Sequence, residues 1–445
     1  MRRLPTVVLV LGSITGVIHA ETHAVLPGGS VQEKIDVAVD GDIVAIFGGT
    51  YNEDLTVTKR IRLVEVNGQE VTLAGNITFS GIENCPPFEG FTVGSNANTN
   101  ITITDTTGLV ISEIDHTAGN SIEINGESTV EITDCSLVNL DPDAGVTSVK
   151  TSSLTGRVEQ NGGAFNISDT TIAGNFETGN DAAKTVAFRV TVTGDCNWRS
   201  NRSWFGYGKA RSFNFNGSDA KVIFVGGEID RLGLESDGML LQGNNNTITI
   251  TNSKITGTIS DWTRNDTNIE ITGSGHSIKV LNNYLKKEYR SNDGGGYHHF
   301  NIVSSVSTLT VANNIVSNTV DGMVYAPFGA KIFNNHSANS RNYGVEGGTS
   351  VVSNTTEGDP LFVDGSVYEL GEGSPCIDAG TEDARYNDRD GTRNNIGPSG
   401  GSWYDPEGWT TEKPVVISFD LTPDQVLEGV NTEVTIDDVR AVSGQ

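Results

Sequence analysis

The chain has 445 residues, of which 19% are charged, and 56 acidic residues outnumber 29 basic ones to give a formal net charge of -27. This length is more than one compact core usually takes, so two domains or one elongated repeat body is expected. The acidic balance argues against general nucleic-acid binding and against attachment to anionic membranes.

The N-terminus has the features of a secretory signal peptide over residues 1–20. Arg2 and Arg3 form a positive start, Leu4 to Ile18 is mostly apolar, and Ala20 is the small residue before a cleavage site. The apolar run is shorter than the about 20 residues that a membrane span needs, and no later run is apolar enough. We therefore expect a secreted protein (extracellular, periplasmic or at a cell surface) with no transmembrane segment in its mature part.

A short helix is expected after the signal peptide. Ser30 and Glu33 have the spacing of a capping box, and Val31, Ile35 and Val39 recur as one apolar helical stripe. The first coil of a repeat body exposes its apolar end, so this helix has a natural position as a cap on that end.

Three short strands separated by corners follow the helix. They cover Ile43 to Phe47, Leu55 to Val57 and Ile61 to Val66, with a glycine turn at Gly48 and Gly49. Three strands joined by corners make one coil of a solenoid. Much of the remaining chain repeats this pattern, in alternating apolar runs that each end at a polar residue.

The polar residues that end these runs are Asp105, Asp134, Asp169, Asn252, Asn282–Asn283, Asn313–Asn314 and Asn334–Asn335. Where the register is clear, neighbouring ends are separated by 29, 35, 30, 31 and 21 residues. A period near 30 with strand patterning predicts a solenoid, whereas a β-sandwich with Asn-rich turns would repeat nearer about 8–12 residues. Asn and Asp tolerate strained turn dihedrals, so a polar ladder inside one bend is expected.

The two ends of this region resemble a known group. The segments that carry the resemblance are Gly41–Val44 with Gly48–Glu53, and Asp359–Asp364, Gly373–Gly380, Asp388–Gly391 and Asn395–Gly397. They are similar to the opening and closing segments of secreted bacterial-type proteins of the pectin-lyase-like superfamily. The resemblance implies an all-β fold, a right-handed parallel β-helix over residues 21–400. It does not imply one reaction, because that superfamily includes lyases, hydrolases and non-enzymatic surface proteins.

The character of the chain changes beyond residue 400. Residues 401–413 read as a linker, and residues 414–445 partly alternate as two or three strands, a small β extension similar to part of an immunoglobulin-like module. About 30 residues are too few for an independent core.

A first cluster of aromatic and basic residues suggests substrate binding. We interpret residues 196–211 as a long loop that carries two of the five Trp, with residues 261–266 as a second loop. Aromatic faces stack on sugar rings and Arg pairs with carboxylates. The candidate binding residues are Trp198, Arg199, Arg202, Trp204, Tyr207, Trp262 and Arg264. The alternative is a long loop over a sheet whose Arg residues are neutralised by surplus carboxylates.

A third cluster, residues 286–299, carries the residue types that a polysaccharide lyase needs. β-Elimination beside a uronate carboxylate requires a cation to neutralise that carboxylate and a base to take the C5 proton. Candidates are Lys287, Tyr289, Arg290 and His299. The alternative is a solvated polar loop. Carboxylate pairs for a hydrolase also occur, but 56 acidic residues make such pairs common by chance.

No specific motif indicates a cofactor. Asp388 to Asp390 begins like a calcium loop, but Arg393 stands where Gly is needed and Ser399 where a bidentate Glu is needed, so we interpret the segment as a turn. No CxxC pair suggests zinc among the four cysteines, Cys85, Cys135, Cys196 and Cys376. Disulfides and buried free thiols both remain open.

Two functions follow from these patterns. One is a secreted, monomeric protein that binds an extracellular polysaccharide and cleaves it, with lyase chemistry favoured over hydrolysis. The other is a non-catalytic cell-surface or adhesive β-helix. The first requires residues 198–211, 261–266 and 286–299 to surround one groove.

Overall fold

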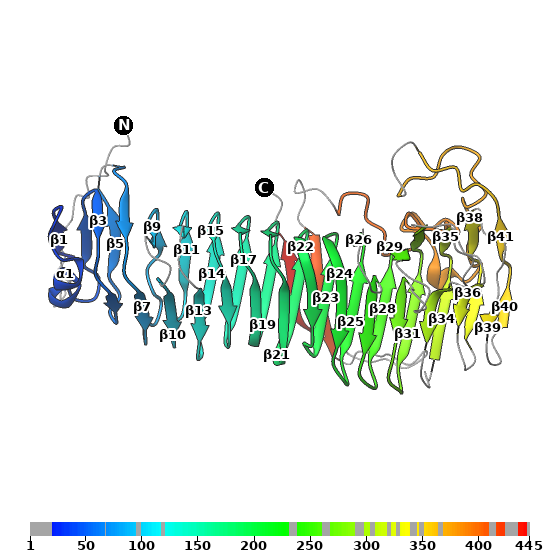
Figure 1. Cartoon of the computed structure of the whole chain (residues 1–445), viewed down its shortest axis with the longest axis horizontal. Helices are drawn as coiled ribbons and strands as arrows, with labels where there is room; N and C mark the ends of the chain where they lie inside the picture. The colour runs from blue at the N-terminus through cyan, green and yellow to red at the C-terminus, as the bar shows by residue number, and fades with distance from the viewer. Residues whose placement is uncertain are drawn as a thin grey trace.

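In this computed structural model of the protein, residues 20–442 are described except for 67, 95–98, 117–120, 231–237, 260–267, 290–297, 303–307, 318–321, 326–329, 339–344, 347–350, 364–367, 409–414 and 423–434. The described chain forms an elongated solenoid in which coil stacks on coil from the N-terminal end onward (Figure 1). The expected parallel β-helix is confirmed, because strands three or fewer positions apart in the chain pair in parallel throughout it.

The strands stack in three columns, which we name sheets A, B and C. Sheet A contains β4 (Leu55–Val57), β7 (Ile77–Ser80), β10 (Ile101–Thr104), β13 (Ile122–Asn125), β16 (Leu140–Pro142), β27 (Met239–Gln242), β30 (Ile269–Ile271), β33 (His298–Ile302), β36 (Gly322–Tyr325) and β39 (Val345–Glu346). Sheet B contains β1 (Thr22–Val25), β2 (Ile43–Ile46), β5 (Arg62–Glu65), β8 (Phe88–Glu89), β11 (Leu109–Ser112), β14 (Thr129–Thr133), β17 (Val146–Lys150), β23 (Arg202–Gly206), β25 (Lys221–Val225), β28 (Thr247–Thr251), β31 (Ser277–Leu281), β34 (Thr308–Ala312), β37 (Lys331–Phe333) and β40 (Val351–Ser353).

Sheet C contains β3 (Gly49–Tyr51), β6 (Val71–Leu73), β9 (Thr92–Val93), β12 (Asp115–His116), β15 (Ser136–Leu137), β18 (Ser153–Leu154), β20 (Thr171–Ile172), β26 (Glu228–Asp230), β29 (Lys254–Ile259), β32 (Tyr284–Tyr289), β35 (Ile315–Ser317), β38 (His336–Ala338) and β41 (Thr356–Glu357). Four long strands bend from one sheet into the next. β19 (Val158–Ser168) and β21 (Phe176–Phe188) run from A to B, and β22 (Thr191–Trp198) and β24 (Lys209–Asn216) run from C to A.

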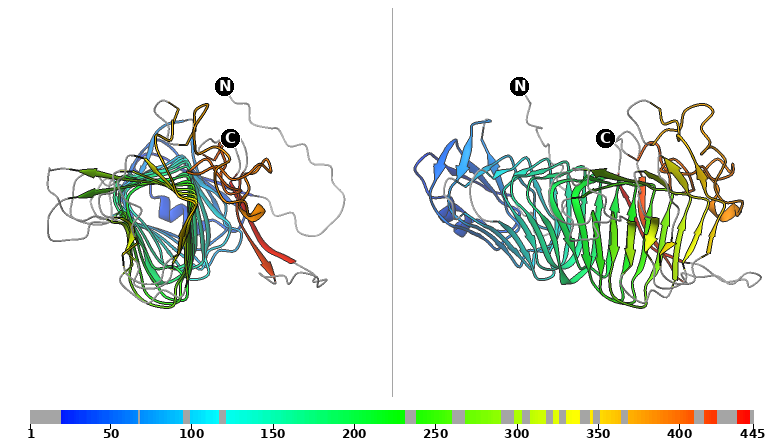
Figure 2. Two further views of the ribbon diagram at one scale, coloured as in Figure 1. Left: turned by 90° about the vertical axis from the view of Figure 1, so that its right-hand side faces the viewer. Right: turned by 45° about the vertical axis from the view of Figure 1, so that its right-hand side comes forward.

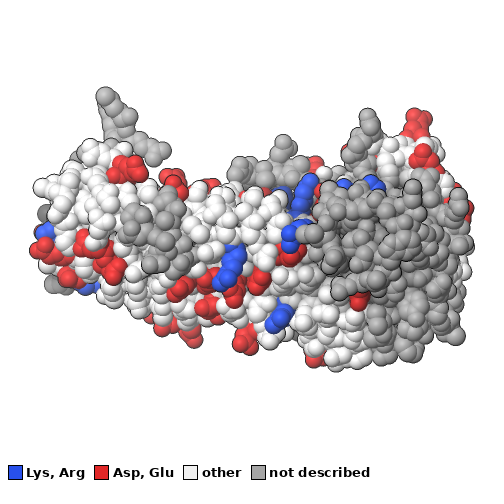
Figure 3. Space-filling view, in the orientation of Figure 1, with Lys and Arg blue, Asp and Glu red and all other residues white. Residues whose placement is uncertain are grey.

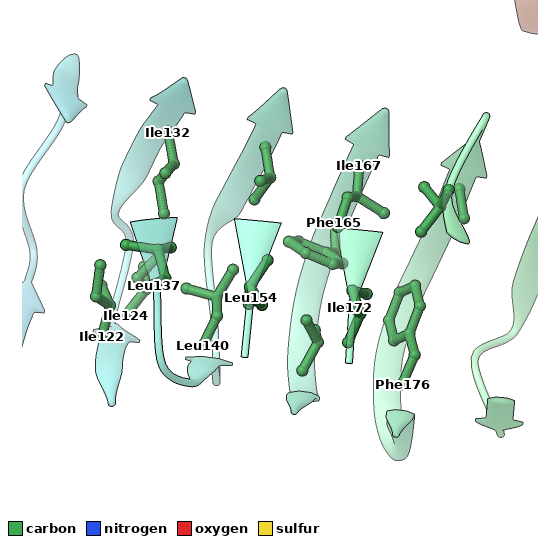
Figure 4. Packing of buried hydrophobic residues seen from close by; sticks show 14 of the residues in the cluster. Ile122, Ile124, Ile132, Leu137, Leu140, Leu154, Phe165, Ile167, Ile172 and Phe176 are labelled. Atoms are coloured by element: carbon green, nitrogen blue, oxygen red, sulfur yellow. The ribbon is translucent and has the colours of Figure 1, made fainter. Parts of the chain in front are cut away.

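Alternation fills the interior of the coils. In the middle coils every second side chain of a strand points inward, and these are mainly Ile, Leu and Phe residues that stack from coil to coil (Figure 4). Phe165 and Phe176 are 0% exposed, with ring centroids 5.7 Å apart. Full burial of such a side chain contributes about 1.5–3 kcal/mol. The buried apolar side chains form one continuous cluster along the solenoid, from Val25 to Ile332.

Helix α1 (Val31–Val37) covers the first coil, as expected, and the end-on view shows it within the outline of the solenoid (Figure 2). Val31 and Ile35 are buried, but Val39 lies beyond the helix and is exposed. Ser30 caps the helix by accepting a hydrogen bond from the Glu33 N–H at 3.0 Å. Glu53, a residue of the first coil, also caps the helix by accepting a hydrogen bond from the Val31 N–H at 2.6 Å.

From β8 onward, the corner between sheets B and C of each coil contains a residue in the left-handed conformation. The thirteen such residues are Gly90, Glu113, Asp134, Thr151, Asp169, Arg189, Tyr207, Gly226, Asn252, Asn282, Asn313, Asn334 and Asn354. Asn and Asp adopt this conformation more readily than other non-Gly residues, which explains the pattern seen in the sequence. Asp105 is a correction, because it follows β10 and occupies the corner between sheets A and B.

The coil length varies more than the expected period of about 30. Successive B–C corners are separated by as few as 17 residues, from Asp134 to Thr151, and by as many as 31, from Asn282 to Asn313. A period near 30 holds only from Asn252 to Asn313. Strands of neighbouring coils pair residue by residue, as β28, β31 and β34 do over five positions each. The extra residues of a longer coil therefore lie mainly in the connections between its strands.

The expected polar ladder is present one residue after these corners. Asn283, Asn314 and Asn335 are fully buried and stack on successive coils. The Asn314 side chain accepts from the Asn283 N–H at 2.9 Å and donates to the carbonyls of Val280 and Ala312, both at 3.0 Å. Each amide therefore pairs backbone groups that the turn would otherwise bury without partners.

The C-terminal segment, residues 376–408, runs back along the outside of the B–C corner. The corner asparagines dock it: Asn334 binds Gly380, Asn282 binds Asn395, and Asn252 binds Gly400. Figure 1 shows this orange part of the chain beside the yellow and green coils. Residues 401–408, expected as a linker, instead pack on the solenoid, because the Tyr207 hydroxyl accepts from the Asp405 N–H at 2.9 Å.

The last described elements are two strands, β42 (Val415–Thr422) and β43 (Thr435–Val442), which pair antiparallel. A short 3-10 turn, η1 (Ala384–Tyr386), precedes them in the docked segment.

The four cysteines are free and buried, so of the two alternatives the structure shows buried thiols and not disulfides. Burial raises the pKa of the Cys85 and Cys376 thiols to about 12. No helix in the described part of the chain is long and apolar enough to cross a membrane.

Candidate functional site

The outer face of sheet A shows a change of chemistry along the solenoid. Its outward row runs in register through β13, β16, β19, β21, β22, β24, β27 and β30. The residues of this row, in that order, are Glu123, Asp141, Glu159, Glu177, Asn197, Asn214, Leu240 and Glu270. Carboxylates thus occupy four consecutive coils, and amides occupy the next two.

The four carboxylates lie one coil apart, about 4.8 Å, because neighbouring strands of a sheet have that separation. Each is held by a neighbour: Asn100 donates to Glu123 at 3.2 Å, Ser121 donates to Asp141 at 2.5 Å, Arg157 pairs with Glu159 at 2.5 Å, and Asn175 donates to Glu177 at 3.1 Å. This part of the face repels a polyanion. It matches the acidic side chains that gather over the N-terminal half of the face in Figure 3.

Beyond β21 the face carries amides and Arg199. The Asn214 side chain donates to the Asn197 side chain at 2.9 Å, which fixes both amides across two coils. Arg199 follows β22, is exposed, and has no ion-pair partner within the described part of the chain. Asn216 and Gln242 are in register beside it on the next coils. Amide and guanidinium groups donate to hydroxyls and carboxylates, so this region can bind an acidic carbohydrate.

An ion pair borders this region where sheet C turns into sheet A. Arg211 donates to both carboxylate oxygens of Asp195, at 3.0 and 2.5 Å, and Ser212 donates to the same carboxylate at 2.5 Å. The hydrogen bonds to Asp195 raise the pKa of Arg211. Arg211 and Asp195 are therefore paired with each other, and Arg199 is the cation that a ligand can contact at this border.

The structure corrects the expectation that residues 196–211 form a long loop. They are not a loop but parts of β22, β23 and β24, and their side chains point in three directions. Trp198 is fully buried, with its ring 5.0 Å from that of Phe176 and 5.2 Å from that of Phe213. A side chain inside the core cannot stack on a sugar, so its expected role in binding is wrong.

The remaining residues of this cluster do not join Arg199. Arg202 and Trp204 belong to β23 in sheet B, where Arg202 is exposed and the Trp204 ring lies 6.2 Å from that of Trp403. Tyr207 is 5% exposed, and its hydroxyl donates to the Trp403 carbonyl at 3.2 Å. Burial raises the pKa of Tyr207. Its hydroxyl holds the C-terminal segment, so its expected contact with a substrate is also wrong.

Three other predicted residues, Lys287, Tyr289 and His299, stand in strands β32 and β33. β29 and β32 pair along six residues, from Lys254 with Tyr284 to Ile259 with Tyr289, whereas neighbouring β26 and β35 have three residues each. Lys287 and Tyr289 stand at the end of β32, and His299 stands in β33 of sheet A.

Three predicted residues fall outside the described residues: Trp262, Arg264 and Arg290. Each stands in the sequence between a strand of sheet C and the next strand of sheet A.

Sequence reasoning missed Asn197, Asn214 and Gln242. A signal was available in Phe213–Asn216, which alternates Phe and Asn and so predicts a strand with an amide face. What the sequence did not contain was the register that aligns these amides across coils.

No cluster of three or more His, Cys, Asp or Glu side chains that could hold a metal ion occurs among the residues that the structure describes. The turn interpretation of Asp388 is confirmed: its carbonyl accepts from the Gly391 N–H at 2.9 Å, and its carboxylate accepts from the Asn395 N–H at 3.2 Å. Burial raises the pKa of Asp388.

No protein-family model and no curated relative matches this chain. Among solved structures it is similar to a PL6 alginate lyase in complex with a trisaccharide, at 14% identity and TM-score 0.32, over 77% of this chain and 86% of that one. It is also similar to an alginate lyase in complex with G6 (14%, TM-score 0.27, 78% and 86%) and to pectate lyase Pel9A (15%, TM-score 0.27, 86% and 97%). Similarities at this level assign no activity to the chain.

Proposed function

We propose that this protein is a secreted β-helix that binds an extracellular polysaccharide containing uronate residues on the outer face of sheet A, from β22 onward. The supporting observation is the exposed, unpaired Arg199 beside the aligned amides of Asn197 and Asn214. A uronate offers one carboxylate to the guanidinium and several hydroxyls to the amides.

The row of carboxylates sets one limit of this site. An acidic polymer avoids the coils from β13 to β21, because Glu123, Asp141, Glu159 and Glu177 would face its own carboxylates. The polymer is therefore expected to lie over β22 and β24, where the row turns to the amides of Asn197 and Asn214.

Cleavage is the finer part of the proposal. In a β-elimination a base takes the C5 proton, the C4–C5 double bond forms, and the C4–O bond breaks as the leaving oxygen takes up a proton. Lys287, Tyr289, Arg290 and His299 remain the candidates for the base and for neutralising the carboxylate. Their support is chain order, since β32 of sheet C is followed in the chain by β33 of sheet A.

Affinity electrophoresis tests binding. The protein is run in gels that contain pectate, alginate, a glycosaminoglycan or a neutral glucan. We expect retardation in at least one uronate gel and none in the neutral gel, and free migration in all uronate gels would contradict the proposal.

Ultraviolet absorbance of unsaturated products tests cleavage on the same polysaccharides. Retardation without unsaturated product would remove the lyase part and favour the non-catalytic surface protein.

A further inference from the structure

The second half of sheet B is basic in an otherwise acidic protein. Six consecutive strands, β23, β25, β28, β31, β34 and β37, contain no Asp or Glu, although the chain has 56 acidic residues. The cations of these strands are Arg202, Lys221, Lys279 and Lys331, and all four are exposed. This face is distinct from that of sheet A and is not used by the proposed polysaccharide site.

The C-terminal segment roofs part of this face and leaves a cavity of about 210 Å³. Its floor is β28 and β31, and its roof comes from the segment around η1 and from residues 401–403. The residues that line it and carry polar or aromatic groups are Thr249, Thr251, Lys279, Asn282, Arg385, Tyr386, Ser402 and Trp403.

Lys279 provides the net charge of this cavity. Its ammonium has no ion-pair or hydrogen-bond partner within the described part of the chain. Arg385 also lines the cavity, but it is bound to Asp383 through two nitrogens, at 3.0 and 2.5 Å, and is neutralised by that carboxylate. The pocket therefore presents one unpaired positive charge.

Aromatic rings and hydroxyls surround that charge. Trp403 is 43% exposed although its ring lies beside Trp204, so one part of the indole remains open. Tyr386 adds a second ring, and Thr249 and Ser402 add hydroxyls. A cation, aromatic surfaces and several hydroxyls within one small cavity match a sugar ring that bears one carboxylate.

We propose that this cavity is a second site, which binds a single carboxylated sugar such as a free uronate or the end residue of an acidic oligosaccharide. Its volume is below the about 300–1,000 Å³ of pockets that take drug-sized ligands, so it suits one ring and not an extended chain. Lys279 pairs with the carboxylate, and Trp403 packs on the ring. The sheet A site differs from it in being open and in binding a polymer.

Isothermal titration of the full chain with sodium D-galacturonate, sodium D-glucuronate and D-galactose tests this site. We expect a uronate to bind and galactose to bind at least about tenfold more weakly, because one charge-assisted contact is lost. Lys279→Met removes the charge and should weaken uronate binding by at least about tenfold.

Lys331→Met is the matched control. Lys331 is an exposed lysine two coils away on the same sheet, and it does not line the cavity. We expect it to leave uronate binding unchanged. The proposal is overturned if neither uronate binds, if galactose binds as tightly, or if Lys331→Met weakens binding as much as Lys279→Met. The sheet A proposal is tested separately, by the binding of polysaccharides. If polysaccharides do not bind but a monomeric uronate does, the sheet A proposal fails and the proposal for this cavity stands.

Discussion

The side-chain amide of Asn282 donates to the side chain of Asn394 at 2.9 Å, joining two buried residues that are 112 positions apart. The same amide donates to the Asn395 carbonyl at 2.8 Å. A left-handed residue at a corner usually serves only to form the turn. Here the side chain of the corner residue also points outward and binds the returning C-terminal segment. Turn chemistry and long-range docking thus come from the same residue.

Asn282→Gly should release this segment. Gly keeps the left-handed corner without strain, so the variant removes only the amide and its hydrogen bonds. We expect a loss of about 2–3 kcal/mol in the free energy of unfolding, from two or three buried hydrogen bonds. Hydrogen exchange of residues 376–401 should also accelerate. Asn354→Gly is the control, because Asn354 has the same conformation but is exposed. Equal effects of the two variants would refute the docking role.

Asn314→Ala should damage the ladder inside the bend. It leaves the buried carbonyls of Val280 and Ala312 and the Asn283 N–H without partners, so we expect a loss of about 3 kcal/mol or more. Asn314→Ser should lose less, because Ser253 at the same corner position satisfies the Gly227 N–H and the Thr251 carbonyl with its hydroxyl. Urea unfolding measures both, and an Ala variant as stable as the Ser variant would be inconsistent with a ladder.

Glu53, not Glu33, completes the helix cap. The Glu53 carboxylate accepts from the Val31 N–H at 2.6 Å and from the Ser30 hydroxyl at 2.7 Å, whereas the Glu33 side chain is exposed. Glu53→Ala should therefore cost about 1–2 kcal/mol in thermal or urea unfolding, and Glu33→Ala close to nothing. A larger loss of stability in Glu33→Ala than in Glu53→Ala would instead support the capping box expected from the sequence.

Asp42 should make the first coil sensitive to acid. Hydrogen bonds from the Val39 and Glu21 N–H groups, and then from His23, lower the pKa of Asp42 from 3.8 to about 2. A lowered pKa means that the folded state prefers the carboxylate, so the stabilisation is complete above pH 3.8 and is lost as the pH falls through about 2. Urea midpoints between pH 2 and pH 6 should show this fall, and Asp42→Asn should flatten it. If the urea midpoint of Asp42→Asn fell with pH as steeply as that of the parent protein, Asp42 would not be the source of the acid sensitivity.

The sequence was sufficient for the fold because its signals are local. Alternation predicts strands, and a corner needs residues such as Asn282 and Asn313 that accept left-handed dihedrals. The same local pattern recurs at Asp105, however, in a different corner. A local turn preference cannot tell which of the two bends a residue occupies, because that depends on how many residues each coil contains.

The candidate site was less predictable for the same reason. Arg199 and Trp198 are adjacent in the chain, yet one is exposed beside sheet A and the other is in the core. Their composition suggested a surface loop, because a strand that bends between sheets carries polar residues on its outer side. Pairing register across coils, which aligns Asn197 with Asn214, is a property of stacking and has no local signal.

The most direct test of the central claim is the affinity of the full chain for a uronate polysaccharide, measured by isothermal titration for the parent protein, Arg199→Ala and Lys331→Ala. Both variants remove one exposed positive charge, but only Arg199 stands beside sheet A. We expect Arg199→Ala to weaken binding at least about fivefold and Lys331→Ala to have little effect. Equal weakening by the two variants, or no binding by the parent protein, would contradict a polysaccharide site on sheet A.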